Sequence, residues 1–93
     1  MSEPLVDARA LSKLRWRCRR GLLENDLFVE RFFARHEATL TENQARGLLV
    51  LMDLSDNDLL DLLLARKEPD GDLAADGDAV LVLHQLRAPA LPR

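Results

Sequence analysis

The sequence has few of the residues that hold secreted or β-rich proteins together. Its 93 residues include one cysteine and no tyrosine, and β-branched residues are scarce. A single cysteine excludes an internal disulfide, which fits a reducing compartment. The shortage of tyrosine and β-branched residues, beside abundant leucine and alanine, favours helices over sheet. We therefore expect an all-α protein.

Long hydrophobic runs are also missing. The longest purely aliphatic stretch has about five residues, whereas a membrane-spanning helix needs roughly 20. The chain does not open with a basic segment followed by an apolar one, so we expect no secretion signal. These absences predict a cytoplasmic protein without membrane insertion. The length predicts a single helical domain, residues 1–93, with an ordered core at about residues 7–88 and short flexible termini.

Recognisable catalytic and metal-binding motifs are absent as well. The sequence has no Gly-rich phosphate loop, no Cys or His cluster with metal spacing, and no nucleophile elbow. Asp26 and Glu30 could suggest acid–base chemistry, but such like charges more often rest near arginines of an adjacent helix. We interpret His36 and His84 as ordinary surface or boundary residues, and Cys18 as a small core residue. We expect no metal site and no enzymatic activity.

Charge is present in quantity but unevenly distributed. Residues 1–20 carry six of the 13 cations and two of the 16 acids, a net charge of +4. The remaining residues carry seven cations and 14 acids, a net charge of −7. Such polarity can serve binding to nucleic acid, binding to an acidic protein, or contacts between the two halves of the chain.

Capping residues and apolar periodicity predict a compact five-helix bundle. The expected helices cover residues 8–19, 22–36, 42–54, 56–66 and 79–87, with Asp7, Thr41 and Ser55 as N-caps of the first, third and fourth. The stretch AVLVL (residues 79–83) could also be a strand, but its longer apolar pattern has helical spacing and a lone strand has no partner. Residues 67–77 contain Pro69, Gly71 and four acids, so we expect a loop there.

The first two helices are predicted to have distinct faces. In the first helix, the core stripe contains Leu11, Leu14 and Cys18, and the opposite basic face contains Arg9, Lys13, Trp16 and Arg20. The second helix has a wide apolar stripe (Leu22, Phe28, Val29, Phe32 and Phe33) and a narrow one (Leu23, Leu27 and Ala34). Since both stripes need covering, we expect this helix to be packed on two sides and central.

The stretch WRCRRGLLEND (residues 16–26) joins these two helices. Arg20 and Glu24 could form an ion pair within a helix beside a turn glycine, although the acid-first order would be the better helical pair. Alternatively, they project outward as a hydrogen-bond donor and an acceptor, while Gly21 lets a partner's backbone approach. We favour the second interpretation, because Trp16 and Arg9 nearby are residue types that interface centres favour.

The same residues carry a family resemblance. The pattern W-x-C-R-R-G-L-L-E-x-D-L at residues 16–27, followed by E-R-F-F at residues 30–33, resembles the SdhE family of FAD assembly factors of succinate dehydrogenase. The resemblance extends over about residues 8 to 88 and includes D-x-D-L-L-x-x-L at residues 56–63. It implies a compact five-helix bundle in the bacterial cytoplasm, acting as a monomer and not as an enzyme.

The resemblance further implies a partner and a set of binding residues. The partner is the flavoprotein subunit of succinate dehydrogenase and, in some bacteria, of fumarate reductase. FAD becomes covalently attached to a histidine of that subunit, so we expect no FAD bound tightly by this chain. The R-G-x-x-E motif falls on Arg20, Gly21 and Glu24, a further acid on Asp26, and a second surface on His36 and Glu37. The chain differs from the family's usual pattern at Ala38, Leu62, Leu63 and Asn25.

Two other functions remain open at this point. A small nucleic-acid-binding module would place Arg9, Lys13 and Arg20 on phosphates, although Glu24 and Asp26 beside them would repel phosphate. A stand-alone FAD carrier would need a dinucleotide-binding fingerprint, which the sequence lacks. We therefore expect no nucleic-acid partner and weak or no affinity for free flavin.

Overall fold

The computed structural model describes residues 4–19 and 23–87. It contains α1 (Ala8–Arg17), α2 (Leu23–His36), a short 3-10 helix η1 (Glu37–Thr39), α3 (Glu42–Met52), α4 (Asp56–Leu63), α5 (Gly71–Ala75) and α6 (Gly77–Arg87). Over the described ranges there is no β-strand, only an isolated backbone bridge between Leu5 and Thr41. The predicted all-α class is confirmed, but the predicted number of five helices is wrong, because the described residues form six.

The extra helix and a shortened one lie in the second half of the chain. Residues 71–77 were expected to be loop, yet α5 forms there because half-buried Leu73 packs against the core and holds one helical turn in place. α4 ends at Leu63, not near residue 66, because Ala65 adopts a left-handed backbone with φ of 60°. The Arg66 N–H then donates to the Asp61 carbonyl at 2.8 Å, which closes a Schellman-type helix end.

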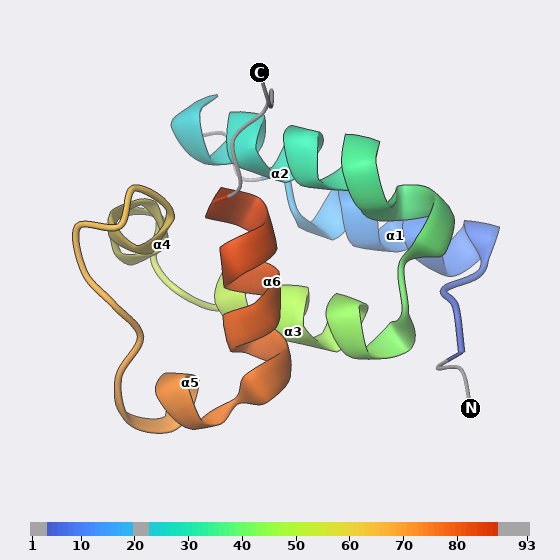
Figure 1. The fold of residues 1–93 in the computed structure, drawn as a ribbon. Helices are drawn as coiled ribbons and strands as arrows, with labels where there is room; N and C mark the ends of the chain where they lie inside the picture. The colour runs from blue at the N-terminus through green and yellow to red at the C-terminus, as the bar shows by residue number, and fades with distance from the viewer. Residues whose placement is uncertain (1–3, 20–22, 88–93) are drawn as a thin grey trace, which may run out of the picture.

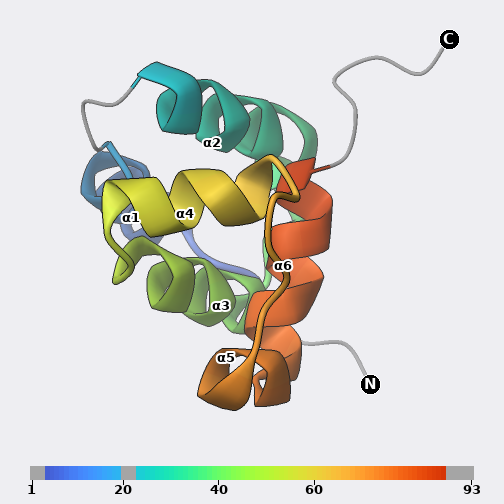
Figure 2. The same cartoon turned by 90° about the vertical axis from the view of Figure 1, so that its left-hand side faces the viewer.

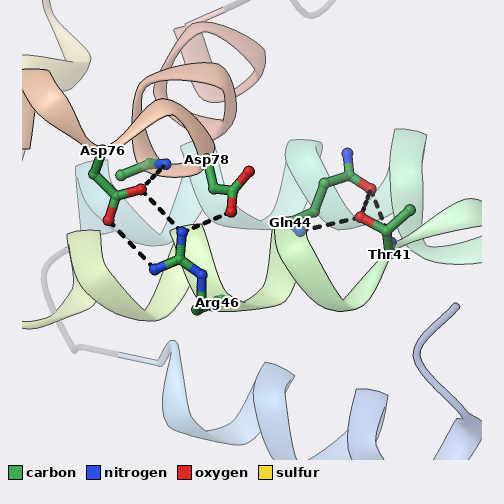
Figure 3. A network of polar contacts seen from close by, with 6 residues as sticks. Thr41, Gln44, Arg46, Asp76 and Asp78 are labelled. Atoms are coloured by element: carbon green, nitrogen blue, oxygen red, sulfur yellow. Dashed lines mark hydrogen bonds and ion pairs between the residues drawn. The ribbon is translucent and has the colours of Figure 1, made fainter. Parts of the chain in front are cut away.

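The three predicted N-caps are confirmed. The Asp7 carboxylate accepts from the Ala10 amide at 2.8 Å, and the Ser55 hydroxyl accepts from the Asp58 amide at 3.2 Å. At the start of α3, the Gln44 amide donates to the Thr41 hydroxyl at 3.0 Å while the Thr41 amide donates to the Gln44 side chain at 2.9 Å (Figure 3). These reciprocal bonds satisfy amides that the helix leaves without partners.

The closest helix pair is α3 with α6, which cross at Gly47 (Figure 1). A Cβ added to Gly47 would lie 2.5 Å from the carbonyl oxygen of Asp78, so only glycine allows this backbone approach. α6 also packs against α2 and α4, and α2 contacts α4 (Figure 2). The predicted apolar stripe of α6 is confirmed, because Ala79, Val82, Leu83 and Leu86 are all buried.

The prediction that α2 is packed on two sides is wrong. Its wide stripe is in the core, where Val29, Phe32 and Phe33 are buried. In the narrow stripe, however, Leu23 is 68% exposed and Leu27 is 44% exposed. The physical reason is that α4 and α6 contact α2, and the buried residues of α2 cluster on one side of the helix. Leu22 lies outside the described residues.

Candidate partner-binding surface

The corner between α1 and α2 is flanked by exposed side chains. Arg20 and Gly21, the first two motif residues, lie outside the described residues. Before them, Trp16 is 74% exposed near the end of α1; after them, Glu24 is exposed in the first turn of α2. A carboxylate in a first turn faces the positive end of the helix dipole. The Glu24 side chain has no ion-pair partner within residues 4–19 and 23–87, so it is available for an outside contact.

A groove with charged walls lies beside this corner, between α1 and α2. Its volume is about 240 Å³, and its floor includes the buried side chains of Cys18, Val29 and Phe33. Arg15 and Trp16 line it from α1, and Arg19 lines it from just beyond the end of that helix. Asp26 and Glu30 line it from α2, so one wall is basic and the other is acidic. Such a groove offers both an apolar contact and complementary polar contacts to a protein partner.

Arg15 connects α1 to η1 and to α2, and the sequence did not predict this role. Its guanidinium lies 2.6 Å from the Glu37 carboxylate and 5.2 Å from the centroid of the Phe33 ring. The two residues are 22 positions apart, so neither capping nor helical spacing pairs them. The charge polarity of the chain was the one available signal. Part of this opposite charge is neutralised within the chain, because the Arg15–Glu37 ion pair connects the basic N-terminal region to the acidic remainder.

The structure separates the two ends of the predicted binding surface. Glu24 and His36 are at opposite ends of α2, about 18 Å apart along the helix axis. The His36 ring packs against Phe32 with 5.0 Å between ring centroids. Partial burial, and then the charge of Arg35, lower the pKa of His36, so its ring is neutral at pH 7. Glu37, next in the chain, is turned toward Arg15 on α1.

The predicted faces of α1 are confirmed for the described residues. Leu14 and Cys18 are buried and Leu11 packs partly against them, whereas Arg9, Lys13 and Trp16 are exposed. Arg9 lies about 10 Å from Trp16 along the helix axis, so the two can contact different parts of a large partner. Among residues 4–19 and 23–87, the side chains of Arg9, Lys13, Arg17 and Arg19 form no ion pair.

The positions that differ from the usual family pattern fall into two environments. Leu62 and Leu63 are buried in α4, so they affect core packing and not a surface contact. Ala38 is exposed in η1. Asn25 is fully buried, where its side-chain amide donates to the Asp56 carbonyl at 3.2 Å and its side-chain oxygen has no partner. Asn25 therefore links the first turn of α2 to the start of α4.

The described residues contain neither a metal-binding cluster nor a membrane-spanning helix. Within the described part of the chain, no three His, Cys, Asp or Glu side chains are grouped so that they could hold a metal ion. No helix formed by residues 4–19 or 23–87 is both long and apolar enough to pass through a bilayer.

The described helices and the groove between α1 and α2 define a small helical protein with a charged, partly apolar surface. Residues 12–86 match the family described as flavinator of succinate dehydrogenase, and the chain belongs to this family. The resemblance seen in the motif is thereby confirmed. Trp16, Glu24, Asp26, His36 and Glu37 all lie within the matched region.

Several bacterial relatives are similar over most of their length. The FAD assembly factor SdhE of Ralstonia nicotianae is 58% identical over 83 residues, which cover 88% of this chain and 85% of the relative. The protein of the same name from Legionella pneumophila is 40% identical over 68 residues, covering 73% and 86%. That from Coxiella burnetii is 41% identical over 70 residues, covering 75% and 80%. No solved structure matches the chain.

Proposed function

We propose that this chain binds the flavoprotein subunit of succinate dehydrogenase and promotes covalent attachment of FAD to it. The observation that carries the proposal is the exposure of Trp16 and Glu24, which flank Arg20 and Gly21 in the sequence, in a chain whose relatives are named FAD assembly factors. The bond-forming chemistry belongs to the flavoprotein. The factor contributes by holding that protein in a conformation where flavin and histidine are correctly aligned.

The residues of the corner have different roles in this proposal. Trp16 supplies a large apolar contact whose burial against the partner drives association. Arg20 donates hydrogen bonds to the partner, and Glu24 accepts hydrogen bonds from it. Gly21 permits a close approach of the partner's backbone. Asp26 and Arg9 extend the same surface. His36 and Glu37 form a second contact area at the far end of α2, which a partner much larger than this chain can reach at the same time.

FAD itself is cargo that ends on the partner. The groove beside the corner has a volume of about 240 Å³, below the roughly 300–1,000 Å³ of sites that enclose small molecules. This supports an arrangement in which the flavoprotein encloses FAD and this chain contacts the outside of that site. We further propose that the chain acts as a cytoplasmic monomer with a single domain, and that it also serves the flavoprotein of fumarate reductase.

The proposal is tested by co-expressing the flavoprotein subunit with variants of this chain. Covalent flavin is read as fluorescence of the subunit after denaturing electrophoresis. We expect Arg20→Ala and Glu24→Ala to abolish this fluorescence. Glu24→Ala should change the free energy of unfolding by less than about 1 kcal/mol, because Glu24 is an exposed charge. Asp72→Ala is the control for Glu24→Ala, because Asp72 is also an exposed acid in the first turn of a helix.

Two outcomes would contradict the proposal. One is full flavin attachment in cells that lack this protein or carry Glu24→Ala. The other is salt-sensitive retention of the wild type on nucleic acid without co-purification of a flavoprotein. The second outcome would favour the nucleic-acid-binding alternative, for which Arg9, Lys13 and Arg20 would supply the phosphate contacts.

A further inference from the structure

A second groove lies on a different side of α1, between α1 and α3. Its volume is about 450 Å³, and its apolar surface comes from Leu5, Val6, Ala10, Leu14, Ala45 and Leu49. The segment before α1 forms one wall. Two backbone hydrogen bonds hold that segment against the start of α3: Val6 N–H to the Leu40 carbonyl at 2.8 Å, and Glu42 N–H to the Pro4 carbonyl at 2.9 Å. Leu5 in this wall is 55% exposed, which leaves apolar surface open to a ligand.

The charges around this groove are separated along its length. α1 and α3 both begin at the end where residues 4–6 cross them, and they run in the same direction (Figure 1). Asp7 and Glu42 are therefore at the starting end. Lys13 and Arg17 lie about 9 and 15 Å further along α1. The groove thus has an acidic end and a basic end with an apolar floor between them.

The two cations of α1 are available for a ligand, whereas the third cation is not. Arg46 of α3 also lines the groove, but its guanidinium points to the start of α6. There it binds Asp76, the residue just before the helix, at 3.1 Å and Asp78 in its first turn at 2.6 Å (Figure 3). Lys13 and Arg17 are exposed, and their side chains have no ion-pair partner in the described part of the chain. Within that part the Glu42 carboxylate is also unpaired.

We propose that this groove binds an amphipathic helix of a partner protein. The helix would place an apolar stripe on the floor, acids of its first turn on Lys13 and Arg17, and basic residues of its last turn on Glu42 and Asp7. It therefore runs antiparallel to α1 and α3, which also aligns its own end charges favourably with its dipole. A groove about 15 Å long accommodates roughly ten helical residues, or three turns. This inference is independent of the proposed function of the corner.

The test uses two synthetic 14-residue helical peptides of identical composition. Both carry leucines at helical spacing; the matched peptide has glutamates in its first turn and lysines in its last, and the swapped peptide has the reverse. Binding is measured by fluorescence anisotropy with the full-length protein. We expect the wild type to prefer the matched peptide by about tenfold, as two or more rim ion pairs provide. Lys13→Glu with Arg17→Glu should reverse that preference.

Control variants test whether peptide binding depends on this groove or on other parts of the surface. Arg31→Glu with Arg66→Glu changes the net charge equally on other exposed faces, and should keep the preference for the matched peptide. Leu5→Ser should weaken both peptides several-fold without changing their ratio, because it removes apolar wall and no charge. The protein with Arg31→Glu and Arg66→Glu should also retain flavin attachment in the corner assay, because neither residue belongs to the surface proposed for the flavoprotein.

Three results would overturn the inference. The first is equal affinity of the wild type for the two peptides, or no saturable binding at millimolar peptide. The second is self-association in sedimentation experiments that Leu5→Ser abolishes, which would identify a second copy of this chain as the occupant. The third is displacement of the matched peptide by decanoate at a lower concentration than the peptide's own Kd, which would identify a small amphiphile.

Discussion

The crossing of α3 and α6 gives the sharpest test of the fold, through the substitution Gly47→Ala. The added Cβ would lie 2.5 Å from the Asp78 carbonyl oxygen, 2.7 Å from its carbon and 3.0 Å from the Ala79 nitrogen. Carbon and oxygen normally approach no closer than about 3.3 Å, so the two helices must separate by about 0.8 Å. All three obstructing atoms are backbone, so no side-chain rotation can relieve the contact.

The expected cost follows from two opposing effects. Overpacking of a buried site typically costs about 1–3 kcal/mol, and a backbone obstruction belongs at the upper end of that range. Alanine recovers at most about 1 kcal/mol because it is the better helix former. We therefore expect Gly47→Ala to lower the free energy of unfolding by about 2 kcal/mol. For a domain of this size, that corresponds to a fall in Tm of about 8–16 °C.

The measurement is urea and thermal unfolding followed by circular dichroism, with Gly77→Ala as the control. Gly77 lies in the first turn of α6, and a Cβ there would meet nothing within 4 Å. Gly77→Ala should change the free energy of unfolding by less than about 0.5 kcal/mol. If Gly47→Ala is as stable as the wild type, or no less stable than Gly77→Ala, the close approach of α3 and α6 is refuted.

Four further substitutions probe the core and the helix ends. Phe32→Ala removes a fully buried ring and should cost about 3–5 kcal/mol in urea unfolding; a neutral result would contradict the burial of the wide apolar stripe of α2. Ala65→Gly should raise the free energy of unfolding by about 0.5–1 kcal/mol, because glycine adopts φ of 60° without strain. An unchanged Tm would argue against a left-handed residue at the C-terminal end of α4. Asn25→Leu should stabilise by about 1 kcal/mol, since it removes a buried oxygen without a partner; destabilisation would mean that its bond to Asp56 matters more. The hydrogen bond from Arg46, and then that from the Ala79 amide, lowers the pKa of Asp76. The ionised Asp76 carboxylate therefore contributes its full stabilisation above about pH 4, and this contribution is lost as the pH falls through the folded-state pKa. Asp76→Asn should reduce the loss of unfolding free energy at acidic pH, and an unchanged acid dependence would exclude this contribution.

Helix N-termini could be predicted from nearby residues in the sequence, whereas one helix C-terminus could not. Asp7, Thr41 and Ser55 were identified as caps because each acts through an amide two or three residues away, and all three bonds are present. The same locality explains the error at α4. Its pattern continues to residue 66, but the left-handed Ala65 ends the helix earlier, and no glycine in the sequence marks that conformation.

Some residues of the candidate surface could be predicted from the sequence, and others could not. The exposure of Trp16 and Glu24 follows from helical periodicity, and the motif around them identified the family that residues 12–86 confirm. Arg15 was missed, because its partner Glu37 is distant in sequence and is brought near by the packing of α1 against α2. Periodicity could not tell whether the narrow stripe of α2 is covered, and Leu23 and Leu27 are exposed.

The helical class, the position of most helices and the motif at the first corner could be predicted from the residues alone, since capping, periodicity and composition act over a few residues. Three features required the packed fold: which of the two apolar stripes of α2 is buried, the approach of α3 and α6 at Gly47, and the groove with an acidic and a basic end between α1 and α3. These features depend on contacts between residues far apart in the chain. Their geometry is set by how the whole core packs, which no local pattern records.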